Sequence, residues 1–305
     1  MIKYLIGMLL MWNLMACTTE QNTSATTING ADVATEMEDT NQVISSRVLK
    51  NDLAKKNLKG NIKSREVLVY AAKIKNGYVT NGATKGGIKT LYNAFGNKVE
   101  LVTYDEKQSI VSTWEYTYDA SNRLLESKYS GDNVRRNITY HYNDKNQLMS
   151  SEEAVNEKVV KKMTYLYDKA GNEIETEASF VESKGKSKSQ HAYDDKGYLR
   201  ETNIYDEKNA LQLKQLYTYN DAGQEIQQSI FTDNNTPSYK RKSTYDAKGN
   251  KIKDAAFTGD GVVNPSDTYQ YKYEYDENGN WTTQIRSNYN GVADQFIEQK
   301  IIYSE

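Results

Sequence analysis

Tyrosine and aliphatic residues alternate with polar residues in short runs along most of this chain. Pairs of tyrosines separated by one residue recur, as in Tyr116-Thr117-Tyr118. A period of two places both rings on the same side of a β-strand, because successive side chains point to opposite faces. The pattern predicts strands of roughly 8 to 10 residues with one aromatic side and one polar side.

A turn motif follows these strands eight times. In each case Tyr precedes Asp or Asn, then two variable residues, then Gly or Asn. Asp and Asn accept backbone hydrogen bonds that start a type I turn, and Gly or Asn tolerates the positive φ that closes a three-residue loop. We therefore predict eight tight β-hairpins, with a positive φ at positions such as Gly249. The motif tyrosines, spaced 24 to 30 residues apart, are Tyr92, Tyr118, Tyr142, Tyr167, Tyr193, Tyr219, Tyr245 and Tyr275.

A second, looser set of turns is predicted midway between these motifs, for example at Asp105 and at Asn290-Gly291. Each repeat then comprises two strands, so we predict an all-β fold of tandem antiparallel β-hairpin repeats. Strand twist accumulates, and open sheets rarely exceed about ten strands without curling. We expect a long curled sheet, superhelical or partly closed.

The repeats are predicted to occupy residues 92–305, with a closing strand over 295–303. Residues 46–91 form an N-terminal segment with capping strands, including one over 58–70 and turns at Asn76-Gly77 and Asn81-Gly82. Apolar residues spaced by about four within residues 41–58 predict a short helix there. Only 37% of residues are hydrophobic, whereas 25 are tyrosine, so an aromatic wall is expected in place of a thick aliphatic core.

The N-terminus is predicted to be a secretory signal over residues 1–16, because Lys3 precedes a short apolar run that ends at Ala16. Leu14-Met15-Ala16-Cys17 resembles the lipobox of bacterial lipoproteins, and this resemblance implies lipid attachment at Cys17. An ordinary secretory signal is the alternative. Residues 17–45 are polar and predict a flexible tether. The expected location is the bacterial cell envelope, with the outer membrane favoured and its leaflet left open.

The motif Tyr-Asp-x-x-Gly-Asn with this period resembles the YD repeat, which belongs to the same class as the RHS repeats of bacterial surface and toxin proteins. In that family the strands build long curled sheets. Short lipoproteins with the opening Leu58-Lys-Gly-Asn-Ile-Lys-Ser64 are similar to a group common in Bacteroidetes. The resemblance implies a cell-envelope protein and no particular activity.

Charge and chemistry narrow the function further. Removal of Lys3 with the signal leaves 38 of the 39 Lys and Arg residues against 41 Asp and Glu, so nucleic acid is not an expected partner. Cys17 is the one cysteine, which excludes an intramolecular disulfide. His141 and His191 lie in strand positions, and no nucleophile motif accompanies them, so we predict a protein that is not an enzyme and has no cofactor. Calcium binding by the Asp-rich turns is a weaker alternative to a structural role.

The tyrosine rows are the best candidate for a binding surface, because exposed aromatic rings stack on sugars and on apolar side chains. Trp114 and Trp281 are the natural places to look for it. We expect an unidentified protein or glycan partner, in addition to the membrane reached through the lipid. The alternatives are a structural or accessory component of an envelope or secretion assembly and, less favoured, a hydrolase.

Overall fold

The computed structural model describes residues 50–232 and 235–304. They form two short helices, α3 (Asp52–Lys55) and η3 (Pro265–Asp267), and 18 antiparallel strands. No helix within these residues has the length and apolar character needed to cross a membrane. The signal sequence, Cys17 and the tether predicted for residues 1–45 lie outside the described residues. The strands are β1 (Ile62–Lys75), β2 (Tyr78–Tyr92), β3 (Lys98–Tyr104), β4 (Ile110–Tyr118), β5 (Leu124–Gly131), β6 (Val134–Tyr142), β7 (Leu148–Val155), β8 (Lys158–Tyr167), β9 (Glu173–Phe180), β10 (Lys186–Tyr193), β11 (Leu199–Tyr205), β12 (Leu211–Tyr219), β13 (Glu225–Thr232), β14 (Thr236–Tyr245), β15 (Lys251–Thr258), β16 (Tyr269–Tyr275), β17 (Trp281–Ser287) and β18 (Ala293–Tyr303).

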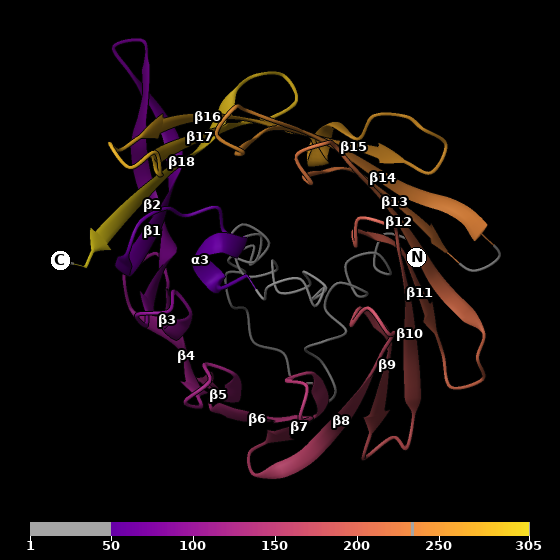
Figure 1. Ribbon diagram of the computed structural model, residues 1–305. Coiled ribbons are helices and arrows are strands. Elements are labelled where there is room, and N and C mark those ends of the chain that lie inside the picture. Colours follow the sequence, from indigo (N-terminus) through magenta and orange to yellow (C-terminus); the bar gives the residue numbers. More distant parts are fainter. Residues whose placement is uncertain (1–49, 233–234, 305) are drawn as a thin grey trace. The chain divides into compact units, whose positions relative to one another are not determined.

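The strands form one closed barrel (Figure 1). Each strand pairs with the next in the chain, and β1 pairs with both β2 and β18. The β1–β18 ladder runs from Ile62 opposite Tyr303 to Ala71 opposite Gln295. The all-β repeat prediction is therefore confirmed, and closure makes it more specific than a curled or partly closed sheet. Closure also pairs the two strands that would otherwise present free edges.

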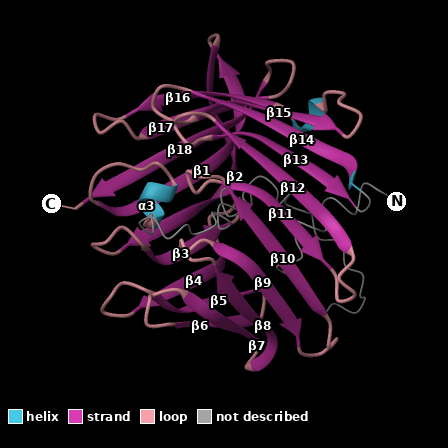
Figure 2. Ribbon diagram, turned by 45° about the vertical axis from the view of Figure 1, so that its right-hand side comes forward, coloured by secondary structure: helices cyan, strands magenta, loops and turns pink. Residues whose placement is uncertain are grey.

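The eight motif turns lie at one end of the strands, called here the tight-turn rim (Figure 2). At Asp246, the Gly249 amide donates to the backbone carbonyl at 3.1 Å, and the side-chain Oδ1 accepts from Lys248 and Asn250 amides at 2.9 and 2.8 Å. Gly249 has φ of 86°, and Asn122 and Asn146, which stand in the same motif position, have φ of 61° and 62°. The predicted turn chemistry is confirmed.

The opposite end, the loose-turn rim, is more ordered than its sequence suggests. Asp105 accepts two amides of its own turn at 2.8 Å each, and Gln108 has φ of 62°. Asp206 and Asn209 repeat this arrangement. These turns have the same chemistry as the tight turns, so the prediction of looser turns is wrong at both places. The motif Tyr-Asp is present before each of them and was the signal that could have shown it.

The N-terminal cap also differs in part from its prediction. Asn76-Gly77 is a turn with two consecutive positive φ values, as predicted. Asn81-Gly82 is not a turn, because both residues lie inside β2. A Cβ atom on Gly82 would lie 2.7 Å from the carbonyl oxygen of Ala71, so glycine is needed for the close approach of β1 and β2. Of the segment 41–58 in which a short helix is predicted, residues 41–49 lie outside the described residues, and the described part contains the single turn α3.

Residues 51–61 run along the tight-turn rim and connect three turns. The Leu53 amide donates to the Gly96 carbonyl at 3.1 Å, and the Asn57 side chain donates to the Lys248 carbonyl at 2.8 Å. Leu53 is buried together with Tyr92 and two further apolar residues of the cap. The aliphatic packing thus concentrates where the two ends of the sheet meet.

The ladder between β15 and β16 is the shortest between neighbouring strands. It consists of Lys253 opposite Gln270 and Asp254 opposite Tyr269. Farther along β15, the backbone of Ala256 is satisfied by the loop, since its carbonyl accepts from the Asn264 amide and its amide donates to Thr268 Oγ1. The four extra residues of this repeat therefore replace part of the ladder with a loop.

Candidate binding surface on the inner wall of the barrel

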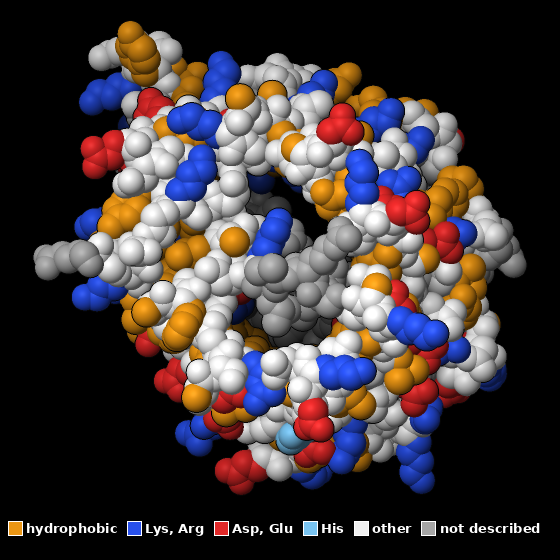
Figure 3. All heavy atoms as spheres, viewed as in Figure 1, with side chains coloured by type: hydrophobic (Ala, Val, Ile, Leu, Met, Phe, Trp, Pro, Cys, Tyr) orange, Lys and Arg blue, Asp and Glu red, His pale blue; other side chains and the backbone are white. Residues whose placement is uncertain are grey.

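The tyrosine side of the strands faces the inside of the barrel. Along β16, residues 269, 271, 273 and 275 are half-buried tyrosines, and the residues between them are exposed and polar. Helix α3 lies within the ring of strands (Figure 1) and packs against Tyr92 and Tyr303 on that side. Figure 3 shows acidic and basic side chains mixed on the rim in view.

The motif tyrosines join neighbouring repeats through their hydroxyls. The Tyr142 hydroxyl donates to the carbonyl of Leu124, the first residue of β5, at 2.9 Å. The β5–β6 ladder begins only at Glu126, so this bond connects the two strands where they have no backbone pairing. We call this contact the tyrosine clasp. Four further clasps have O···O distances of 2.6–3.0 Å and join Tyr118 to Lys98, Tyr167 to Leu148, Tyr193 to Glu173, and Tyr245 to Glu225.

The other tyrosine of each pair lies opposite a smaller polar side chain on the next strand. Tyr140 lies opposite Ser151, and Tyr165 lies opposite Thr176. Large and small residues thus lie opposite each other on neighbouring strands of the inner wall, and the small residues leave room for the rings. Burial raises the pKa of Tyr165 to about 12, so the neutral phenol is the favoured form.

His191 takes the place of the first tyrosine in its pair and lies opposite Thr202. Its Nδ1 is 3.1 Å from Thr202 Oγ1, and its Nε2 is 3.7 Å from Glu173 Oε1. Burial lowers the pKa of the His191 imidazole and raises the pKa of the Glu173 carboxyl. Both shifts favour uncharged groups, so this contact is not a strong ion pair despite its distance. His141 is exposed on the outer wall, so the two histidines do not share a site.

The two predicted tryptophans both lie on the inner wall but at separate places. The Trp114 ring lies 6.1 Å from Tyr116 with 14° between the planes, and 5.1 Å from Tyr129. Trp281 lies on β17, where it packs against the buried β1 residues Val67 and Val69. Four strands, β18 and β1 to β3, separate β17 from β4. Trp114 therefore belongs to an aromatic group of the wall, whereas Trp281 belongs to the packing where the barrel closes.

Several charged residues of the inner wall are paired with one another. Arg136 contacts Glu153, and their side chains are 14% and 12% exposed. Arg241 contacts Asp254 at 2.6 Å and Asp267 at 2.7 Å, with the Asp254 side chain 8% exposed. Such pairs place charged, hydrogen-bonding side chains on the inner wall. The sequence does not predict these pairs, because their members lie on different strands or in η3.

The outer wall carries exposed ion pairs. Lysines of β5, β8, β10 and β12 each lie 2.6–3.2 Å from a glutamate on the same or a neighbouring strand. The apolar series that follows the tight turns also faces outward, with Leu125, Met149, Ile174 and Ile252 38–43% exposed. A lipid-facing barrel needs an apolar outer band, because charged side chains there are costly. The described outer wall is instead suited to water.

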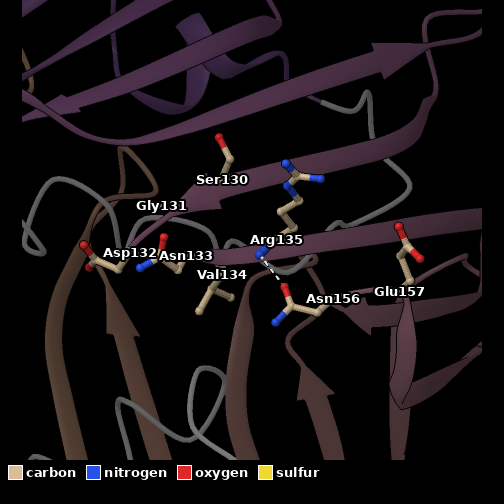
Figure 4. Close-up of a pocket in the computed structure, with 8 residues that line it drawn as sticks. All are labelled: Ser130, Gly131, Asp132, Asn133, Val134, Arg135, Asn156 and Glu157. Atoms are coloured by element: carbon tan, nitrogen blue, oxygen red, sulfur yellow. Dashed lines mark hydrogen bonds between the residues drawn. The ribbon is translucent and has the colours of Figure 1, made fainter.

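Two cavities lie near the loose-turn rim. One, of roughly 460 Å³, is bounded by the β5–β6 turn and the β7–β8 turn (Figure 4). Within it the Arg135 amide donates to Asn156 Oδ1 at 2.9 Å. A second, of roughly 470 Å³, includes Tyr129 and Lys128. Across the described residues, no three His, Cys, Asp or Glu side chains are arranged to hold a metal ion.

No protein-family model and no curated protein matches this chain. Among solved structures, a porin-like protein from Bacteroides uniformis is 10% identical, over 79% of this chain and 98% of that one, with a TM-score of 0.42. A porin-like protein from Bacteroides vulgatus is 11% identical over 81% and 99%, with a TM-score of 0.37. The TcdB2–TccC3 complex is 11% identical over 80% of this chain and 17% of that one, with a TM-score of 0.28. Because these scores are low, the function is argued below from this chain's own residues.

Proposed function

We propose that this chain is a lipid-anchored cell-envelope protein that performs no catalysis and binds an extended glycan or polypeptide on the inner wall of its barrel. The observation that carries the proposal is the contrast between the two walls. Hydroxyl-bearing rings and paired charges line the inside, whereas exposed ion pairs cover the outside. Trp114 with Tyr116 and Tyr129 is the aromatic group that we assign to the ligand.

The barrel is wide enough for such a ligand. Eighteen strands at about 4.8 Å spacing give a backbone diameter of about 27 Å before strand tilt widens it. Barrels of 16 to 18 strands leave an aqueous channel when nothing fills them. Stacking on each accessible ring contributes on the order of 0.5–1.5 kcal/mol. Several weak contacts along a polymer would then add up to useful affinity.

An array of neutral and acidic oligosaccharides, together with unfolded polypeptides, tests the ligand assignment. Trp114→Ala should weaken binding of any recognised probe by about tenfold, and Tyr129→Ala should weaken it in the same direction. Leu166→Ala is the matched control, because Leu166 is 54% exposed on the outer wall. Equal effects of inner-wall and outer-wall variants would contradict the proposal, as would a binding loss confined to His191 or Glu173.

A purely structural role is the second candidate, and one observation favours it. Five of the motif tyrosines already use their hydroxyls to join repeats. If no probe on the array binds and the inner-wall variants fold normally, the structural role is the better account.

Anchoring is tested separately with Cys17→Ser. The variant should lose acyl labelling and move from the membrane fraction to the soluble fraction. Unchanged membrane partition without acyl label would contradict the anchor.

A further inference from the structure

One sector of the outer wall gathers lysines on three neighbouring strands. Lys240 and Lys242 on β14, Lys253 on β15 and Lys272 on β16 all point outward, and the last three are exposed. We call these four residues the lysine track. Four other outward lysines, Lys128, Lys162, Lys186 and Lys214, are each paired with a glutamate. Within residues 50–232 and 235–304, none of the four has a carboxylate at ion-pair distance.

The register brings the four lysines into one diagonal row. Lys242 lies opposite Ala255, two residues from Lys253 on the same strand. Lys253 lies opposite Gln270, two residues from Lys272. Diagonal neighbours in a sheet are about 7–8 Å apart. The row is thus a line of like charges at regular spacing.

The residues facing the track are neutral. Lys240 lies opposite Phe257, Lys253 opposite Thr244, and Lys272 opposite Ile285. The Lys242 ammonium lies 5.8 Å from the centre of the Phe257 ring. Like charges on neighbouring strands lower the stability of a sheet. Glu274, two residues from Lys272 on β16, is exposed on the same face but forms no ion pair with it. A partner that supplies negative charge would explain four neighbouring lysines with no carboxylate of the described residues at ion-pair distance.

We infer that the lysine track binds the anionic headgroups of the bilayer to which the chain is tethered. This inference rests on the lipid anchor of the proposed function. Residues 17–49 number 33 and can span at most about 110 Å, several times the width of the barrel. The outer wall can therefore reach the membrane surface. Each lysine near an anionic leaflet is attracted to it, and salt screens the attraction.

The experiment uses the acylated full chain on vesicles of phosphatidylcholine alone or mixed with phosphatidylglycerol. Because Cys17 is the one cysteine and is acylated, an added cysteine is the one free thiol. Thr244→Cys places a fluorophore beside Lys253, and Thr164→Cys places it on the outer wall of β8 as the matched position. Quenchers on the lipid headgroups report which wall contacts the membrane.

The Thr244 label should be quenched on anionic vesicles and not on neutral ones. The ratio of molecules whose lysine track contacts the membrane to molecules whose track does not should be about tenfold or more higher on anionic vesicles. High salt should abolish the difference, as should Lys242→Gln combined with Lys253→Gln and Lys272→Gln. Lys128→Gln with Lys162→Gln and Lys214→Gln should leave it unchanged. The Thr164 label should stay unquenched.

Equal quenching of the two labels on both kinds of vesicle, with the protein still floating with the vesicles, overturns the inference and leaves the anchor intact. Failure to float contradicts the anchor itself, which is a different result. Binding of soluble polyphosphate to the track, combined with no preference for anionic vesicles, would make an anionic polymer the partner instead of the bilayer.

Discussion

At the scale of single residues, the tyrosine of the repeat has two separate tasks. Its position before Asp or Asn fixes where the strand ends and the turn begins. Its hydroxyl then closes the gap between repeats, as Tyr142 does with the Leu124 carbonyl. The sequence shows the first task plainly, because the motif recurs. It cannot show the second, because the acceptor is a backbone atom on another strand.

Tyr142→Phe should destabilise the protein by about 1 kcal/mol, since it removes one net hydrogen bond and leaves a carbonyl unpaired. Tyr205→Phe is the control, because its hydroxyl has no hydrogen-bond partner in residues 50–232 or 235–304. Denaturant unfolding of both variants measures the difference. Equal midpoints for the two variants would mean that the clasp does not contribute to stability.

At the scale of elements, the strands and hairpins are well determined by local rules. The period of two and the positive-φ positions place the repeat strands and the tight turns, since both depend on neighbouring residues alone. The pairing partners of the first and last strands of the sheet do not follow from neighbouring residues. Closure depends on β1 lying between β2 and β18, which are far apart in sequence, and no local pattern encodes that. The turn predicted at Asn81-Gly82 is wrong for the same reason, because glycine there serves a contact between β1 and β2.

The β15–β16 junction is the element-scale weak point. Its ladder is short, and Asp267 supports it from η3 by accepting from the Tyr239 hydroxyl and from Arg241, each at 2.7 Å. Asp267→Ala should cost about 1–3 kcal/mol, because bonds to a charged group are lost. Amide hydrogen exchange should accelerate in β15 and β16 and remain unchanged in β7 and β8.

Glu152→Ala is the control for this prediction, since it removes the exposed pair with Lys162 at a junction with a long ladder. Exposed pairs contribute little. Uniform acceleration of exchange in all strands by Asp267→Ala would show that the junction is not a separate weak point.

At the scale of the whole molecule, the buried tyrosines of the inner wall should make the free energy of unfolding decrease at alkaline pH. Burial raises the pKa of both Tyr142 and Tyr165 from 10.0 to about 12. A raised pKa in the folded state means that these rings stabilise the fold fully below pH 10. Their contribution is lost as the pH rises through about 12, because the unfolded chain ionises first.

The denaturant midpoint should therefore fall between about pH 10 and pH 12, together with the rise in tyrosinate absorbance. Tyr142→Phe combined with Tyr165→Phe should reduce this dependence. Titration of every tyrosine near its ordinary pKa, without loss of stability, would contradict the buried aromatic wall.

Closure of the barrel is the central claim, because the tyrosine face of the sheet lines an enclosed interior only if the sheet closes. Leu68 on β1 lies directly opposite Glu298 on β18, so cysteines at both positions are close enough for a disulfide. In a Cys17→Ser background, Leu68→Cys with Glu298→Cys should crosslink within one chain as readily as Lys128→Cys with Asn137→Cys. That second pair spans a single hairpin and reacts whether the sheet is open or closed. A closed barrel predicts equal crosslinking of the two pairs in the native protein. An open sheet predicts that the hairpin pair alone reacts, and that result would contradict the account.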